Sequence, residues 1–278
     1  MRILADLVAD LTTLPALPQM VTRILALVND PQSQASEVAK LMVREPTLAA
    51  RVLKLANSPY YGLEHKLNDI NRAIVVIGFN TLRTVVVSAS MVNAFRIGLP
   101  TGFSRANFWK HSIVSAAAAR ELALRTGIDP ELAYSAGLLH DIGKLVMDYY
   151  TPNETEKILR KARNESLSFR ESEVFTDLSH AFLGGELAQW WNLDAPLRDA
   201  IATHHDPENA TDKMLFAAVS FANYLSHITG LSPGSFSKPA LDRNSWIHLK
   251  LKQEDLPELL GMVKNEIKLA NAILSVSA

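Results

Sequence analysis

The chain of 278 residues contains no cysteine. It can therefore form neither a disulfide framework nor a zinc site with thiolate ligands. This absence fits a reducing compartment, and we predict a cytoplasmic protein. The formal net charge is −1, so the chain as a whole lacks the positive field that attracts nucleic acid. We therefore expect partners other than nucleic acid.

Long uninterrupted hydrophobic runs are also missing. The most apolar stretch, residues 73–91, contains Asn80, Thr81, Arg83 and Thr84, so it predicts no membrane span. Asp6 stands too early for the apolar region of a signal peptide. There is no internal repeat, and apolar residues make up 48% of the chain, enough for a buried core. These features predict a soluble globular protein that does not enter a membrane.

Apolar residues in the first hundred positions recur at helical spacing. Val21, Ile24 and Val28 mark one amphipathic helix, and Ser36 and Pro46 suit the starts of the next two. The β-branched runs at 74–77 and 85–87 could be strands by propensity. The 3.6-residue spacing around them instead favours two helices, the first closed by Gly78. We predict a bundle of five or six short helices with no catalytic residues.

The second half is again helical, after a predicted boundary at residues 98–102 (GLPTG). Asp129 is a good helix cap before Pro130, and either Asp177 or Ser179 can cap a later helix. The predicted fold class is all-α, with an N-terminal bundle of short helices packed on a second helical bundle. The predicted domains are residues 1–98, residues 103–230, and a loop with a C-terminal helix at 231–278.

One stretch, residues 137–145 (GLLHDIGKL), places a histidine and an aspartate in an apolar helical segment. Buried ionisable groups are costly unless they are paired or bind a metal. On a single helix, one face would carry Ala133, Ala136, Gly137, His140 and Lys144. The small residues would let another helix or a metal come close, and Lys144 could reach Asp141 or an anionic ligand. Two interpretations follow: a divalent-metal phosphate site, or a buried His–Asp–Lys cluster without a ligand.

Five of the eight histidines fall at inward-facing or terminal positions of successive predicted helices in the second half. They are His111, His140, His180, His204 and His205. A single such histidine is usually a core residue, but five of them with Asp141 indicate a metal site. Imidazole suits zinc, iron, nickel and manganese, and a bridging carboxylate can hold two ions about 3.5–4 Å apart. We therefore expect a divalent metal (Fe, Mn, Zn or Ni), as one ion or two.

The ordered pattern of His111, His140-Asp141, His180 and His204-His205 resembles the HD-superfamily phosphohydrolases, and in particular their HD-GYP branch. Five N-terminal segments resemble the signature of the HDOD domain, the "HD-related output domain". They are residues 14–18 (LPALP), 30–31 (DP), 45–48 (EPTL), 55–58 (LANS) and 73–78 (AIVVIG). The resemblance covers roughly residues 10–225. It implies an HDOD subdomain followed by an HD-like subdomain, and six metal ligands: His111, His140, Asp141, His180, His204 and His205. It also implies a metal-bridging Asp141 and a Lys144 that meets a substrate phosphate.

Two departures from the HD-GYP pattern bear on activity. His204-His205 is followed by Asp206-Pro207 where those proteins carry a Gly-Tyr-Pro segment. The last metal aspartate of the family falls at Asn223, whose amide brings no negative charge. Many HDOD domains resemble non-catalytic signalling modules, and this chain keeps six of seven ligand positions.

The sequence therefore leaves two candidate functions. The first is a regulatory module that retains a metal site and relays a signal by binding a signalling protein or a small phosphorylated ligand. The second is a metal-dependent phosphohydrolase, in which Asp141 and Lys144 act on a phosphomonoester or phosphodiester. The departures favour the module.

Overall fold

The computed structural model describes residues 19–30, 32–94, 101–237 and 243–277. Every regular element in these ranges is a helix, so the predicted all-α fold class is confirmed. Four features used in the sequence analysis lie outside the described residues: Asp6, the proline-rich lead-in at 14–18, Pro31, and positions 98–100 of the predicted domain boundary.

Contacts divide the described residues into two compact units. One unit contains residues between 15 and 96 together with residues from 268 onward, and the other contains residues between 97 and 267. The first unit begins with four helices: α2 (Gln19–Asn29), α3 (Ala35–Met42), α4 (Pro46–Ala56) and α5 (Ile70–Ala94). Helix α5 packs against α2, α3 and α4, and Ile24, Met42, Leu55, Ile74 and Leu82 are fully buried.

Helix α5 confirms the helical interpretation of both β-branched runs. Gly78 interrupts it with φ 75° and ψ 163°, values that a residue with a side chain rarely adopts. The two predicted helices are therefore the two arms of α5, separated at this glycine. The prediction that Ser36 caps α3 is wrong. That helix begins at Ala35, because Glu37 Oε2 accepts a hydrogen bond from the Gln34 backbone N–H (3.2 Å) and closes the first turn one step earlier.

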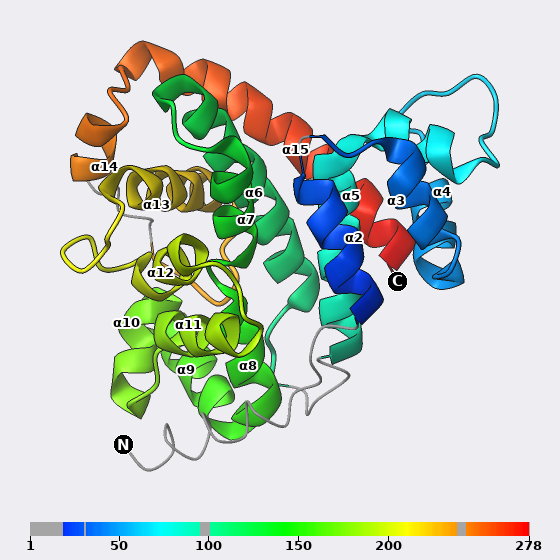
Figure 1. Cartoon of the computed structure of the whole chain (residues 1–278). Helices are drawn as coiled ribbons and strands as arrows, with labels where there is room; N and C mark the ends of the chain where they lie inside the picture. Colours follow the sequence, from blue (N-terminus) through cyan, green and yellow to red (C-terminus); the bar gives the residue numbers. More distant parts are fainter. Residues whose placement is uncertain (1–18, 31, 95–100, 238–242, 278) are drawn as a thin grey trace. The chain divides into compact units, whose positions relative to one another are not determined.

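The second unit holds the motif-bearing helices. They are α6 (Arg105–Thr126), α7 (Pro130–Leu139), α8 (Ile142–Tyr150), α9 (Pro152–Glu165), α10 (Phe169–Glu173), η1 (Val174–Thr176), α11 (His180–Trp190), α12 (Ala195–Thr203), α13 (Lys213–Ile228), α14 (Arg243–His248), η2 (Gln253–Asp255) and the first part of α15 (Leu256–Ser277). In this unit α6 packs against α7 and α13, and α11 packs against α8 and α12 (Figure 1).

Two glycines allow the close approach of these helices. A Cβ on Gly137 of α7 would lie 2.7 Å from the Ser115 backbone carbonyl of α6. A Cβ on Gly143 of α8 would overlap the His180 carbonyl at the start of α11. The small residues around the central motif therefore admit neighbouring helices.

The prediction that one continuous helix carries the His–Asp pair is wrong. Helix α7 ends at Leu139 and α8 begins at Ile142, so His140 and Asp141 lie at the junction between the two. Asp141 leaves helical geometry (φ −96°, ψ 7°) and takes the N-cap position of α8. Lys144 therefore approaches Asp141 from the first turn of a new helix, and the single predicted face does not extend to it.

Within the described parts of the chain, no single helix is long and apolar enough to cross a membrane. Two arms of α5, Ile70–Phe79 and Thr81–Val87, pass the same test of length and composition only when they are taken together, across a bend of 101°.

Candidate metal centre

Helix ends place most of the predicted ligands. His111 lies within α6, whereas His180 is the first residue of α11 and His204 follows the last residue of α12. Ser179 is the cap of α11, since its side chain accepts a hydrogen bond from the Phe182 N–H (3.3 Å). The other predicted cap, Asp129, accepts from two N–H groups of α7, at 2.9 and 3.3 Å. These caps fix where each helix begins and therefore where its ligand side chain lies.

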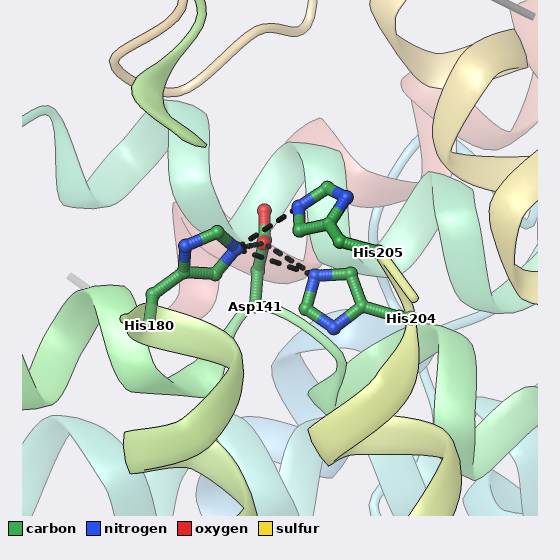
Figure 2. Close-up of side chains that lie close together, drawn as sticks. All are labelled: Asp141, His180, His204 and His205. Atoms are coloured by element: carbon green, nitrogen blue, oxygen red, sulfur yellow. Dashed lines mark hydrogen bonds and ion pairs between the residues drawn. The ribbon is translucent and has the colours of Figure 1, made fainter. Parts of the chain in front are cut away.

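The structure brings all six predicted metal ligands together in two groups that share Asp141. The His111 group consists of His111, His140 and Asp141. The His180 group consists of Asp141, His180, His204 and His205. Within each group the potential ligand atoms lie within 4.8 Å of one another. Figure 2 shows the three imidazoles of the His180 group around the Asp141 carboxylate.

Backbone carbonyls orient three of the imidazole rings. The Nδ1 atoms of His111, His140 and His204 lie 2.9, 2.9 and 2.8 Å from the carbonyl oxygens of Leu231, Gly137 and Ile201. A carbonyl oxygen only accepts, so each Nδ1 must carry the proton and donate it. In the neutral rings this leaves the Nε2 lone pair free and turned towards the cluster, as metal-ligating histidines require.

A carboxylate orients the fourth ring. Glu173 Oε2 lies 2.7 Å from Nδ1 of His180 and 2.9 Å from the backbone N of the same residue. The sequence interpretation missed Glu173, because η1 and a short loop separate it from His180 and no helical spacing relates the two. Its signal was only an acidic residue seven positions before a predicted ligand.

The Nε2 atoms face one another, and Nδ1 carries the proton in His111, His140, His180 and His204. They are 3.2 Å apart for His111 and His140, 3.3 Å for His180 and His204, and 3.1 Å for His180 and His205. Opposed lone pairs repel, whereas a cation between them would be bound by both. Asp141 Oδ1 is buried and has no hydrogen-bond partner, although two of these nitrogens lie 3.2 and 3.5 Å away. A donor set of imidazole nitrogens and one carboxylate fits a divalent transition metal.

Burial keeps most of these imidazoles neutral. Desolvation lowers the pKa of His140 to about 3, and it also lowers the pKa of His111, His204 and His205. His180 differs: burial opposes its charged form, but Glu173 and Asp141 outweigh burial and raise its pKa. Without an ion, an imidazolium at His180 could donate to both carboxylates. A proton and a metal ion therefore compete for the same nitrogen.

Asp141 stays ionised in this buried setting. Burial opposes its charge, but Lys144, followed by His140, His180 and His204, outweighs burial and holds the pKa of Asp141 well below its usual range. Lys144 Nζ lies 2.6 Å from Asp141 Oδ2, and both side chains are buried. The Lys144 ammonium also lies 5.2 Å from the centre of the Phe169 ring. Lys144 is thus a partner of Asp141 rather than a free cation.

Two further polar side chains of α13 each have one buried atom without a partner. Asn223 Oδ1 and His227 Nε2 have no hydrogen bond, and the two residues are one turn apart. The His227 ring lies 5.1 Å from the His111 ring, and desolvation lowers its pKa to about 4. Asn223 was considered as a ligand position from the sequence, but His227 was not among the predicted ligands.

Comparison with known proteins gives a family match and several relatives. A family model described as the HDOD domain matches residues 14–207. An uncharacterised protein of Treponema pallidum (strain Nichols) is 30% identical over 79% of this chain and 44% of its own length. Ribonuclease Y 1 of Pediococcus pentosaceus is 34% identical over 57% of this chain and 24% of its own length. The chain thus spans less than half the length of both relatives.

The crystal structure of an HDOD domain protein of unknown function from Geobacter sulfurreducens aligns over 98% of this chain and 97% of that one, with a TM-score of 0.78 and 27% identity.

Proposed function

Since this chain belongs to the HDOD domain family, we propose that it is a regulatory module whose helical bundle binds a divalent metal ion. The ion would be iron, manganese, zinc or nickel, since imidazole suits iron, zinc and nickel and a carboxylate suits manganese. The observation that supports this proposal is the arrangement around Asp141. Imidazole Nε2 atoms surround its carboxylate, and one of its oxygens is buried without a partner. In the proposed role, the module relays a signal by binding a signalling protein or a small phosphorylated ligand.

Burial of the cluster favours a regulatory ion over a catalytic one. His111, His140, Asp141, His180 and His204 are all buried, with exposed fractions of 0–2%. Only His205 is half-buried. A substrate phosphate would have to reach the ion past His205, whereas a structural ion needs no such access. The amide at Asn223 and the missing Gly-Tyr-Pro segment after His205 support the same choice.

A bound ion would act on the bundle by joining its parts. The ligands come from α6, from the junction of α7 and α8, and from the ends that face each other on α11 and α12. An ion that binds only the folded arrangement stabilises it by mass action, by about 2.7 kcal/mol at a free concentration 100 times its Kd. The state of the bundle would then report the availability of the metal.

A metal-dependent phosphohydrolase is the second candidate. It is favoured by the pairing of Lys144 with Asp141, and by the similarity to a protein named ribonuclease Y. When bound, a divalent ion polarises phosphoryl oxygens and lowers the pKa of water towards neutrality. In this role Asp141 would hold the ion and Lys144 would neutralise a substrate phosphate. Lys144 would first have to exchange Asp141 for the phosphate, because its ammonium is already paired.

One experiment separates the two functions. The purified full chain is freed of metal with a chelator, reloaded with Mn²⁺, Fe²⁺ or Zn²⁺, and compared with the Asp141→Ala variant. The regulatory proposal predicts a higher Tm for the loaded wild type and no change in Tm for the variant. It also predicts no Asp141-dependent turnover of a generic phosphodiester, bis(p-nitrophenyl) phosphate. Robust turnover that the variant abolishes would contradict it and establish the hydrolase.

A further inference from the structure

We infer that the cluster holds one divalent ion, in the His180 group, and that the Lys144 ammonium takes the place of a second ion in the His111 group. This inference rests on the proposed function, since it says where the proposed ion binds. It departs from the two-ion arrangement that a bridging carboxylate would allow. Three observations support it, and they concern Asp141, the number of ligands and the buried charge.

The two oxygens of Asp141 have different surroundings. Oδ1 lies 3.2 Å from His180 Nε2 and 3.5 Å from His204 Nε2, and it has no hydrogen-bond partner. Oδ2 faces the other group, and Lys144 Nζ lies 2.6 Å from it. One oxygen is therefore available to an ion, whereas the other already has a cation within bonding distance.

The two groups also differ in the number of ligands. The His180 group offers three imidazoles and Asp141 Oδ1, which completes the four-coordinate set that zinc and similar ions adopt in closed sites. The His111 group offers two imidazoles and the oxygen that Lys144 holds. His227 of α13, whose ring lies 5.1 Å from the His111 ring, could add a neutral donor but no negative charge.

Charge decides against a second ion. Among the described residues at the cluster, Asp141 and Glu173 are the carboxylates, and Lys144 is the ammonium. These charges sum to −1, and one divalent ion in the His180 group brings the sum to +1. A second would add two more positive charges in a buried site, within a few ångströms of both the first ion and the Lys144 ammonium.

Matched variants test this inference by ion content. The purified chain is loaded with Co²⁺, dialysed, and measured by elemental mass spectrometry, alongside His180→Ala and His111→Ala. Both variants remove one fully buried histidine of the cluster. We expect one ion per chain in the wild type, at least a tenfold loss in His180→Ala, and near-complete retention in His111→Ala. Two ions in the wild type, or equal loss in both variants, would overturn the inference and leave the proposed function standing. No ion in the wild type would instead overturn both.

A second variant keeps the test decisive if His180→Ala fails to fold. Lys144→Met removes the ammonium and frees Asp141 Oδ2 while it keeps a side chain of similar length. With Co²⁺ in excess, we expect its ion content to rise from one towards two per chain. An unchanged content of one would show that Lys144 does not take the place of a second ion.

Discussion

Glu173 holds His180 at two points with a single carboxylate oxygen. Oε2 accepts a hydrogen bond from the ring Nδ1–H at 2.7 Å and another from the backbone N–H at 2.9 Å. The first contact fixes the ring tautomer with Nε2 towards Asp141, and the second fixes the first residue of α11. Glu173 itself is buried, so this carboxylate serves His180 rather than solvent.

Replacing Glu173 by glutamine should therefore weaken metal binding without removing a ligand. An amide keeps the size of the side chain but is a weaker acceptor for the ring N–H, so His180 loses both orientation and basicity. Losses at such supporting positions are typically about 10–100-fold in metal affinity. The affinity is measured by competition with a chromogenic chelator. Glu171→Gln, an exposed change on the same short helix that also removes one carboxylate, is the matched control and should leave the affinity unchanged. Equal affinity in Glu173→Gln and the wild type would contradict a positioning role.

Gly143→Ala should destabilise the second unit. The added Cβ would overlap the carbonyl oxygen of His180, and backbone atoms cannot move aside as a flexible side chain can. Overpacking of this kind typically costs about 1–3 kcal/mol. The free energy of unfolding is measured by urea denaturation. The overlap should also push α11 away from α8, which would displace His180 and weaken metal binding.

Gly261→Ala is the matched control for that change. It lies within α15, and an added Cβ meets nothing within 4 Å. Alanine there should stabilise the chain by about 0.5–1 kcal/mol, since it restricts the unfolded chain and suits a helix interior. Equal free energies for the two variants would show that the contact between α8 and α11 is not tight.

Acidification should destabilise the metal-free protein. Folding lowers the pKa of His140 to about 3 from an ordinary value of 6.5, and lowers that of His227 to about 4. Below pH 6.5 these histidines therefore bind protons in the unfolded chain but not in the folded chain. The free energy of unfolding falls as the pH drops. The pKa values of His111, His204 and His205 are shifted in the same direction. His180, whose pKa is raised, acts in the opposite direction but is a single residue.

The expected size of this effect is about 1.4 kcal/mol for each histidine that stays neutral at pH 5.5. Urea denaturation at pH 7.5 and pH 5.5, in the presence of a chelator, measures it. His140→Gln should reduce the difference between the two pH values, whereas the exposed His248→Gln should not. Equal or greater stability at pH 5.5 would contradict the buried neutral state of these histidines.

The helices, and the residues that lie together around Asp141, could be predicted from the sequence because both depend on local patterns. Apolar spacing gave α2 and α5, the glycine at position 78 marked the break in α5, and the Asp129–Pro130 pair marked the start of α7. His111, His140, His180, His204 and His205 could be selected because each falls at an inward or terminal position of its helix.

What the sequence could not give depends on contacts between distant residues. The break between α7 and α8 at His140-Asp141 follows from packing, with Gly143 pressed against the start of α11, and no residue there is a strong helix breaker. Glu173 has no helical relation to His180, and the Leu231 carbonyl that orients His111 lies 120 residues away from it. The separate surroundings of the two Asp141 oxygens are likewise a property of the assembled bundle.

Metal content tests the central claim most directly. The full chain is purified without added metal, incubated with Mn²⁺, Fe²⁺ or Zn²⁺, dialysed, and measured by elemental mass spectrometry beside Asp141→Ala, which removes the one residue common to both groups. The account predicts a bound transition metal ion in the wild type and its loss in the variant. Wild-type protein that holds no ion after incubation with any of the three metals would contradict it, and the cluster would then be a buried set of hydrogen-bonded side chains.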